Sequence, residues 1–357
     1  MNWELSRHMA SEDTRWRRGG FGGWANACGE VWLWSGSWRW DWSSVVGSGI
    51  EEVEGAELSA WCAQHLGSES AETLFAAGNL SRVVGLRLRD GRNVVVKVRP
   101  AEARLAGCAE VQRRLWGSGF PCPEPLAGPA PLAETGYAVN AEVLIEGGAA
   151  YPPGEGADRA EAFASLLARF IDLAPSPDDV PDLAPSPAWI NWDHQFPGVW
   201  PPPDDRDVDL NQLPETAWLD ELGHAARTRL AATRATAPVI GHCDWESHNL
   251  EFRDCEPWAV HDWDSVVCAA ETVIVGVAAA MWPAGVDSVG AGIEQSEQFL
   301  DAYQRARGRA FSPQQVEEVW AAGVWIRAFN AKKFLLDGVD TLSGEEAEER
   351  ARRGGLA

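Results

Sequence analysis

The sequence predicts an α+β protein with two lobes: a small N-terminal lobe with an antiparallel sheet and one helix, and a larger, mainly helical C-terminal lobe. Strand patterns dominate the stretch before Gly148, and amphipathic helical patterns dominate the stretch after it. A chain of 357 residues is also too long for one simple hydrophobic core. We therefore expect the N-terminal lobe over 51–146 and the C-terminal lobe over 147–357.

Residues 1–50 differ from the rest of the chain. They hold eight of the 20 tryptophans, set among glycine, serine and arginine, without a period of 2 or 3.6. We expect a poorly ordered extension outside the main core. Tryptophans interleaved with arginines could bind single-stranded nucleic acid or sugars. The net charge of −23 argues against nucleic acid as a partner, because its phosphates require a basic surface.

The N-terminal lobe is expected to contain strand, strand, helix and strand, after a short helix over 57–65. The stretches VVGLRLR and VVVKV read as strands, and DGRN between them supplies a hairpin turn. Apolar residues then recur at helical spacing through Leu105, Val111 and Leu115 until Gly117 ends the pattern. The stretch YAVNAEVLI predicts the strand that completes the lobe.

Helical patterns return in the C-terminal lobe. ADRAEAFASLLARFIDLA and residues 215–236 predict helices, and SPQQVEE opens a long helix with serine as N-cap and proline at the first position. The proline-rich segment over 175–205 is long for a loop, so it is either an insertion or a functional lid. The apolar run over 273–282 is too short to span a membrane, and no signal-peptide pattern is present. We expect a cytoplasmic protein without a membrane partner.

The strongest local signal is HCDWESHN, residues 242–249, directly after the short apolar strand PVIGH. It places Asp244 and Asn249 at the H-x-D-x-x-x-x-N spacing of a kinase catalytic loop, and Asp262 follows at the end of a second strand. Phosphoryl transfer needs a carboxylate that orients the attacking hydroxyl, together with oxygen ligands for magnesium. These three residues can supply both. The alternative is that Asp244 and Asn249 only cap turns.

Lys97 is the only lysine among the first 331 residues, and it lies inside VVVKV. A lysine flanked by valines on a strand is costly unless its amine meets a partner. Glu110, in the predicted helix, is one candidate partner, and Glu102 is the other. The competing interpretation is an edge strand whose lysine faces water. Before the strand VVGLRLR, AAGNLSR (76–82) could fold over phosphates, although its single glycine, Gly78, also fits a plain turn.

The order of these motifs, from about Ala71 to about Pro283, resembles the aminoglycoside phosphotransferase and choline kinase family. These are small-molecule kinases with a protein-kinase-like fold. The resemblance implies ATP and Mg²⁺ as cofactors, and transfer of the γ-phosphate to a hydroxyl of a small molecule. A cationic acceptor, an aminoglycoside or an amino alcohol, suits the acidic chain.

The resemblance also implies a role for each matching residue. It assigns Asp244 as the catalytic base and Asn249 and Asp262 as magnesium ligands. The residues implied to bind the nucleotide are the pair Lys97 and Glu110, the turn residues Gly78 and Ser81, and the hinge residues Val143, Leu144 and Ile145.

Two departures and two alternatives accompany this assignment. The chain lacks a full G-x-G-x-x-G loop, and Trp-Asp follows Asp262 where a protein kinase has Phe-Gly. The roles of Asp264 and Glu246 stay open. A pseudokinase-like nucleotide-binding module is the first alternative, and a binding protein that acts through its tryptophan-rich N-terminus is the second. The sequence does not indicate an oligomeric state or the acceptor.

Overall fold

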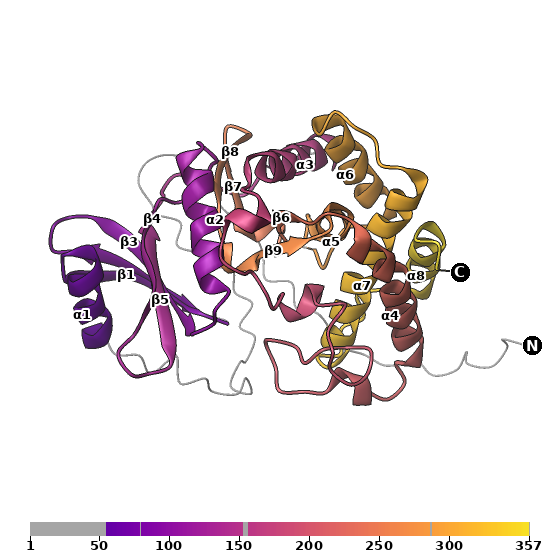
Figure 1. Ribbon diagram of the computed structural model, residues 1–357, viewed down its shortest axis with the longest axis horizontal. Helices are drawn as coiled ribbons and strands as arrows, with labels where there is room; N and C mark the ends of the chain where they lie inside the picture. The colour runs from indigo at the N-terminus through magenta and orange to yellow at the C-terminus, as the bar shows by residue number, and fades with distance from the viewer. Residues whose placement is uncertain (1–54, 79, 153–155, 286–287, 357) are drawn as a thin grey trace, which may run out of the picture. The chain divides into compact units, whose positions relative to one another are not determined.

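Five antiparallel strands form the N-terminal sheet, in the order β1-β2-β3-β5-β4 (Figure 1). The computed structural model describes residues 55–78, 80–152, 156–285 and 288–356, all within one unit that extends from Arg39 to Ala357. The predicted extension over 1–50 lies outside the described residues. The strands are β1 (Ser70–Gly78), β2 (Arg82–Leu88), β3 (Asn93–Pro100), β4 (Pro125–Pro131) and β5 (Tyr137–Val143).

Strand β3 places Lys97 on the face of the sheet opposite the one that packs on helix α1 (Gly55–Leu66). Alternate residues of a strand point to opposite faces. Val94, Val96 and Val98 pack in one hydrophobic cluster with Trp61 of α1, so Lys97 points to the other face. β3 pairs with β2 on one side and β5 on the other, so the edge-strand interpretation of Lys97 is wrong.

Helix α2 (Leu105–Gly117) lies between the sheet and the C-terminal helices (Figure 1). It contacts β4 of the sheet, and also the short strand β9 and the turn before it in the C-terminal part. Its buried residues include Cys108, Val111 and Leu115, which belong to the large hydrophobic core of the C-terminal part. The helix therefore joins the two parts of the fold.

The C-terminal part is mainly helical and carries two small, two-stranded antiparallel sheets. Strand β6 (Val239–His242) pairs with β9 (Val266–Ala269), and β7 (Leu250–Arg253) pairs with β8 (Glu256–Val260). The helices are α3 (Gly156–Leu173), α4 (Ala217–Leu230), α5 (Glu271–Met281), α6 (Ile293–Ala306), α7 (Pro313–Leu335) and α8 (Gly344–Arg353). The predicted α+β fold class, with an antiparallel sheet first and helices after it, is confirmed.

Helix α5 is the centre of the C-terminal core, because every one of its residues is buried. It packs against α7, and Gly276 permits the close approach, since a Cβ there would collide with the Val319 carbonyl oxygen. Helix α7 begins as the sequence predicts: Ser312 caps it, Pro313 is its first residue, and Gln315 completes the capping box. In the described part of the chain, no helix is both long and apolar enough to cross a membrane.

The proline-rich segment between α3 and α4 is packed against the helices, although it contains only three short 3₁₀ turns. Trp200 is fully buried, and its Nε1 donates to the Asp220 carboxylate on α4 at 2.5 Å. Trp325 on α7 donates to the Trp189 carbonyl oxygen at 2.8 Å. Buried aromatic side chains therefore hold this insertion in place.

Candidate active site

The end of β6 and the loop after it carry both buried and partly exposed side chains. His242 and Trp245 are fully buried, whereas Asp244 is partly exposed. His242 Nε2 lies 3.0 Å from the His261 carbonyl oxygen, and its Nδ1 accepts from the Asp244 amide at 3.3 Å. Burial lowers the pKa of His242, so the ring is neutral and anchors the loop through these two contacts.

Asn249 is hydrogen-bonded to Asp244. Its Nδ2 donates to Asp244 Oδ2 at 2.7 Å and to the Asp244 carbonyl oxygen at 2.9 Å. With the amide nitrogen engaged in this way, the amide oxygen of Asn249 is the atom left to bind a cation. The same contact engages Oδ2 of Asp244, so Oδ1 is the oxygen left for a substrate proton. Burial, reinforced by the charge of Asp262, raises the pKa of Asp244.

Asp262 follows β8 in a backbone conformation that is rare for a residue with a side chain. Its φ is 62° and its ψ is 53°, in the left-handed region. Such a conformation costs on the order of 1–3 kcal/mol and persists only where its surroundings hold it. Burial alone would raise the pKa of Asp262, but the adjacent Lys97 ammonium holds this pKa far below its usual range. The carboxylate is therefore ionised.

Asn249 and Asp262 together offer an amide oxygen and a carboxylate. Mg²⁺ prefers such hard oxygen ligands, and it keeps several water molecules when few protein groups bind it. The donor set therefore fits the predicted magnesium site.

Lys97 contacts Asp262 across 165 residues of sequence, with Nζ 3.0 Å from Oδ1. Its side chain is only 10% exposed. Burial alone would lower the pKa of Lys97, but Asp262, Asp264 and Glu142 outweigh that effect and raise it. Lys97 is therefore charged and directed at the carboxylate predicted to bind magnesium.

The predicted pair of Lys97 with Glu110 does not form. The Glu110 carboxylate binds Arg113 and Arg114 of its own helix, and these contacts lower its pKa to about 2. The physical reason is helical phase: at 100° per residue, Glu110 lies away from the buried face of α2. Gln112 is on that face, and its Nε2 donates to Glu142 at 2.8 Å.

Glu142 and Arg99 are site residues that the sequence reasoning missed. Glu142 is 3% exposed and adds negative charge beside Lys97. Arg99, two residues after Lys97 and on the same face of β3, forms an ion pair with Asp264. Burial and the charge of Asp262 nevertheless raise the pKa of Asp264. Period-2 alternation along VVVKVRP could have found Arg99, since it places positions 97 and 99 on one face.

Of the hinge residues 143–145, which are predicted to bind the nucleotide through their backbone, two have N–H groups that already donate within the fold. The amide of Val143 donates to the Glu124 carbonyl oxygen at 2.9 Å, and that of Leu144 donates to Asn93 at 3.1 Å. Both N–H groups therefore already have an acceptor. The carbonyl groups of these two residues and the backbone of Ile145 are left to contact the nucleotide base.

The predicted phosphate loop is the tight connection between β1 and β2. Gly78 ends β1 and pairs with Arg82 at the start of β2. Ser81 lies inside this connection. The loop is therefore short, as expected for a hairpin turn.

A second acidic group and a histidine lie beside Asp244. Side-chain ligand atoms of Asp244, Glu246 and His248 lie within 4.8 Å of one another. Burial and the neighbouring Asp244 charge raise the pKa of Glu246 well above its usual value, while Lys333 opposes the shift. Lys333 itself pairs with Asp205 of the proline-rich insertion at 2.7 Å. The insertion and the end of α7 therefore adjoin the catalytic loop.

An antiparallel sheet followed by a mainly helical part is the architecture of the protein-kinase-like class. Residues 72–319 match the family model of the phosphotransferase enzyme family. The chain therefore belongs to the phosphotransferase enzyme family. No curated protein matches it.

Many solved structures share the fold, among them the following two. One is an amicoumacin kinase described as a complex with AMP-PNP, Ca²⁺ and Ami, which is 12% identical, with a TM-score of 0.51, over 85% of this chain and 94% of that one. The other is a candidate aminoglycoside phosphotransferase from Ralstonia eutropha, 16% identical, with a TM-score of 0.51, over 85% of this chain and 95% of that one.

Proposed function

We propose that this chain transfers the γ-phosphate of ATP to a hydroxyl group of a small molecule. The observation that carries the proposal is the convergence of Lys97 from the sheet with Asp262, and of Asn249 with Asp244. Family membership supports phosphotransfer, and the absence of Phe-Gly after Asp262 argues against a protein kinase.

In the proposed reaction, Asp244 Oδ1 orients the acceptor hydroxyl and takes its proton. The hydroxyl oxygen forms a bond to the γ-phosphorus, and the bond from that phosphorus to the bridging oxygen of ADP breaks. Lys97 binds phosphate oxygens. Asn249 and Asp262 would hold Mg²⁺, which supplies charge neutralisation at the phosphates. A raised pKa makes Asp244 a stronger base than an ordinary aspartate.

The test is ATP turnover with Mg²⁺ across aminoglycosides, macrolides, choline and amino alcohols, with the phosphorylated product identified by mass spectrometry. We expect one of these acceptors to be phosphorylated. ATP binding without turnover on any acceptor would favour the alternative, a pseudokinase-like nucleotide-binding module.

We further propose a cationic acceptor, because Glu246 and Asp244 place two carboxylates where the acceptor must bind. An acceptor ammonium group would form a charge-assisted hydrogen bond with Glu246, of the kind that contributes about 1.5–3 kcal/mol. The net charge of −23 favours the approach of such a molecule.

Glu246→Gln is expected to raise the acceptor KM by about tenfold and to leave the ATP KM unchanged, because about 1.4 kcal/mol corresponds to a tenfold change in affinity. Steady-state kinetics with each substrate varied in turn measures both constants. Glu256→Gln, at an exposed position of the β7–β8 hairpin, is the control and should match the wild type. An unchanged acceptor KM in Glu246→Gln would contradict the cationic contact.

A further inference from the structure

Arg104 attaches α2 to the turn that follows Asp262. This arginine immediately precedes the helix and is only 5% exposed. Its guanidinium donates to the carbonyl oxygens of Asp264 at 2.6 Å, Val266 at 2.7 Å and Leu183 at 3.3 Å. One side chain from the N-terminal part thus binds three carbonyl groups on two segments of the C-terminal part. The planar fork of arginine permits this, whereas a lysine ammonium has no such fixed geometry.

The first turn of α2 fits closely on the same surface. Gly107 lies against residues 181–183. A Cβ at this position would collide with the carbonyl oxygen of Pro181. Cys108 Sγ lies 3.8 Å from the Val266 carbonyl oxygen. The position of α2 is therefore set by the turn after Asp262 and by residues 181–183.

The turn held in this way is the one that fixes Asp262 in its left-handed conformation. The Ser265 amide donates to the Asp262 carbonyl oxygen at 3.0 Å, and this bond closes the turn. Arg104 binds the backbone of Asp264 inside the turn, and Arg99 binds the Asp264 side chain. Two arginines that precede α2 therefore hold Asp264, which lies between Asp262 and β9.

We propose that Arg104 is a positioning residue for Asp262, acting through the turn over 262–266. The proposal rests on the proposed function, in which Asp262 is a magnesium ligand. Lys97 and Glu110 do not pair, and Arg104 instead connects the start of α2 to the turn that carries Asp262. Arg104 differs from Lys97 in that its guanidinium binds backbone carbonyl groups, whereas the Lys97 ammonium binds the Asp262 carboxylate.

The test compares Arg104→Lys with wild type in the full chain. We expect the Mg²⁺ concentration for half-maximal activity to rise about tenfold, since partners that orient metal ligands typically contribute 10–100-fold. Amide hydrogen exchange over 262–266 should accelerate in the metal-free protein, a readout that does not depend on activity. Gly107→Ala keeps Arg104 but displaces α2 from the Pro181 carbonyl group, and it should shift both readouts in the same direction.

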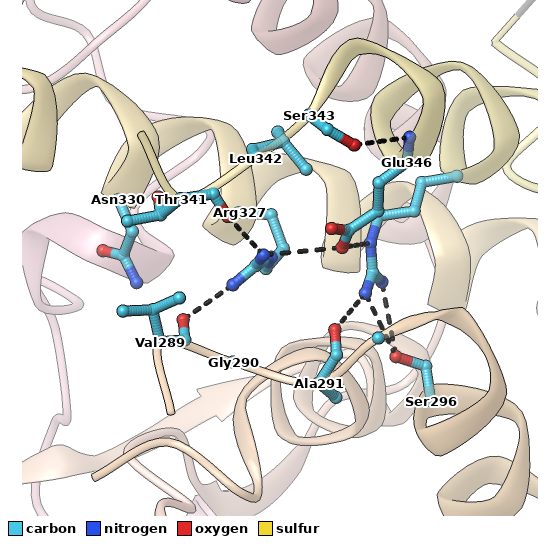
Figure 2. Close-up of polar contacts among 12 residues, drawn as sticks. Val289, Gly290, Ala291, Ser296, Arg327, Asn330, Thr341, Leu342, Ser343 and Glu346 are labelled. Carbon is cyan, nitrogen blue, oxygen red and sulfur yellow. Dashed lines mark hydrogen bonds and ion pairs between the residues drawn. The ribbon is translucent and has the colours of Figure 1, made fainter. Parts of the chain in front are cut away.

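Arg327→Lys is the matched control. Arg327 is 4% exposed and donates to the carbonyl oxygens of Val289 and Thr341, both at 2.6 Å, in a cluster with Glu346 on α8 (Figure 2). It thus also joins separate segments through backbone carbonyl groups, without contact to the turn over 262–266. We expect a lower melting temperature but an unchanged Mg²⁺ midpoint and unchanged exchange over 262–266.

Two results would overturn the positioning role. One is an Arg104→Lys protein with wild-type Mg²⁺ midpoint and exchange. The other is an equal change in Arg327→Lys, which would indicate general destabilisation. If the wild type phosphorylates no acceptor, the proposed function fails, and the exchange comparison alone still decides whether Arg104 holds the turn.

Discussion

Asp244→Asn is expected to lower kcat by about 10²–10⁴-fold, the range that a general base contributes. The substitution removes the proton acceptor but keeps the size of the side chain and an oxygen that can accept from Asn249. The loss should appear in kcat with little change in the ATP KM, because Lys97 and the hinge are untouched. Steady-state kinetics and calorimetric ATP binding measure the two effects separately.

The same variant should be as stable as the wild type, or more stable, near pH 7. Burial raises the pKa of Asp244, which means that the folded protein disfavours its negative charge. Removing that charge therefore does not cost folding energy, and thermal unfolding checks this. Asp254→Asn, in the exposed turn of the β7–β8 hairpin, is the control. Asp244→Asn with activity within twofold of wild type would rule out Asp244 as the base.

Asp262→Asn is expected to reduce Mg²⁺-dependent activity by at least about 10²-fold, because it removes the one carboxylate of the proposed metal site. Asparagine tolerates the left-handed backbone better than alanine, so it separates loss of the carboxylate from backbone strain. A Mg²⁺ titration of activity measures the effect. Full activity at ordinary Mg²⁺ concentration would contradict the ligand role.

The pH dependence of stability gives an independent test of the contact between Lys97 and Asp262. The folded pKa of Asp262 is far below its unfolded value, so the contact stabilises the protein above about pH 4. That contribution is lost as the pH falls through the folded pKa. In Asp262→Asn the fall in melting temperature below about pH 4 should be shallower than in wild type. Parallel curves for the two proteins would show that the pair adds nothing to stability.

The catalytic-loop assignment could be made from sequence because its information is local. The spacing from His242 to Asn249 follows a short strand, and a loop of that length brings Asp244 and Asn249 into hydrogen-bond contact. Alternation along β3 likewise determines that Lys97 points away from the valines that pack on α1. Both patterns act over fewer than ten residues.

The error at Glu110 arose where the sequence carries less information. The helix was predicted, and α2 is present, but its rotation about its own axis is set by what it packs against. Gly107 and Cys108 face the C-terminal part, and that contact leaves Glu110 off the buried face of α2, where its carboxylate pairs with Arg113 and Arg114 of the same helix. The helical period alone does not say which face meets the sheet.

The α+β fold class, the loop that brings Asp244 and Asn249 together and the strand that carries Lys97 could be predicted from the sequence alone, because periodicity and spacing are properties of neighbouring residues. Only the tertiary structure decided the partner of Lys97, the link from Arg104 to the turn after Asp262, and the approach of the insertion to α7. These contacts join residues that are widely separated in sequence, for example Lys97 and Asp262 at 165 residues. Contacts between residues so far apart in the sequence form through tertiary packing, and a local sequence pattern does not predict them.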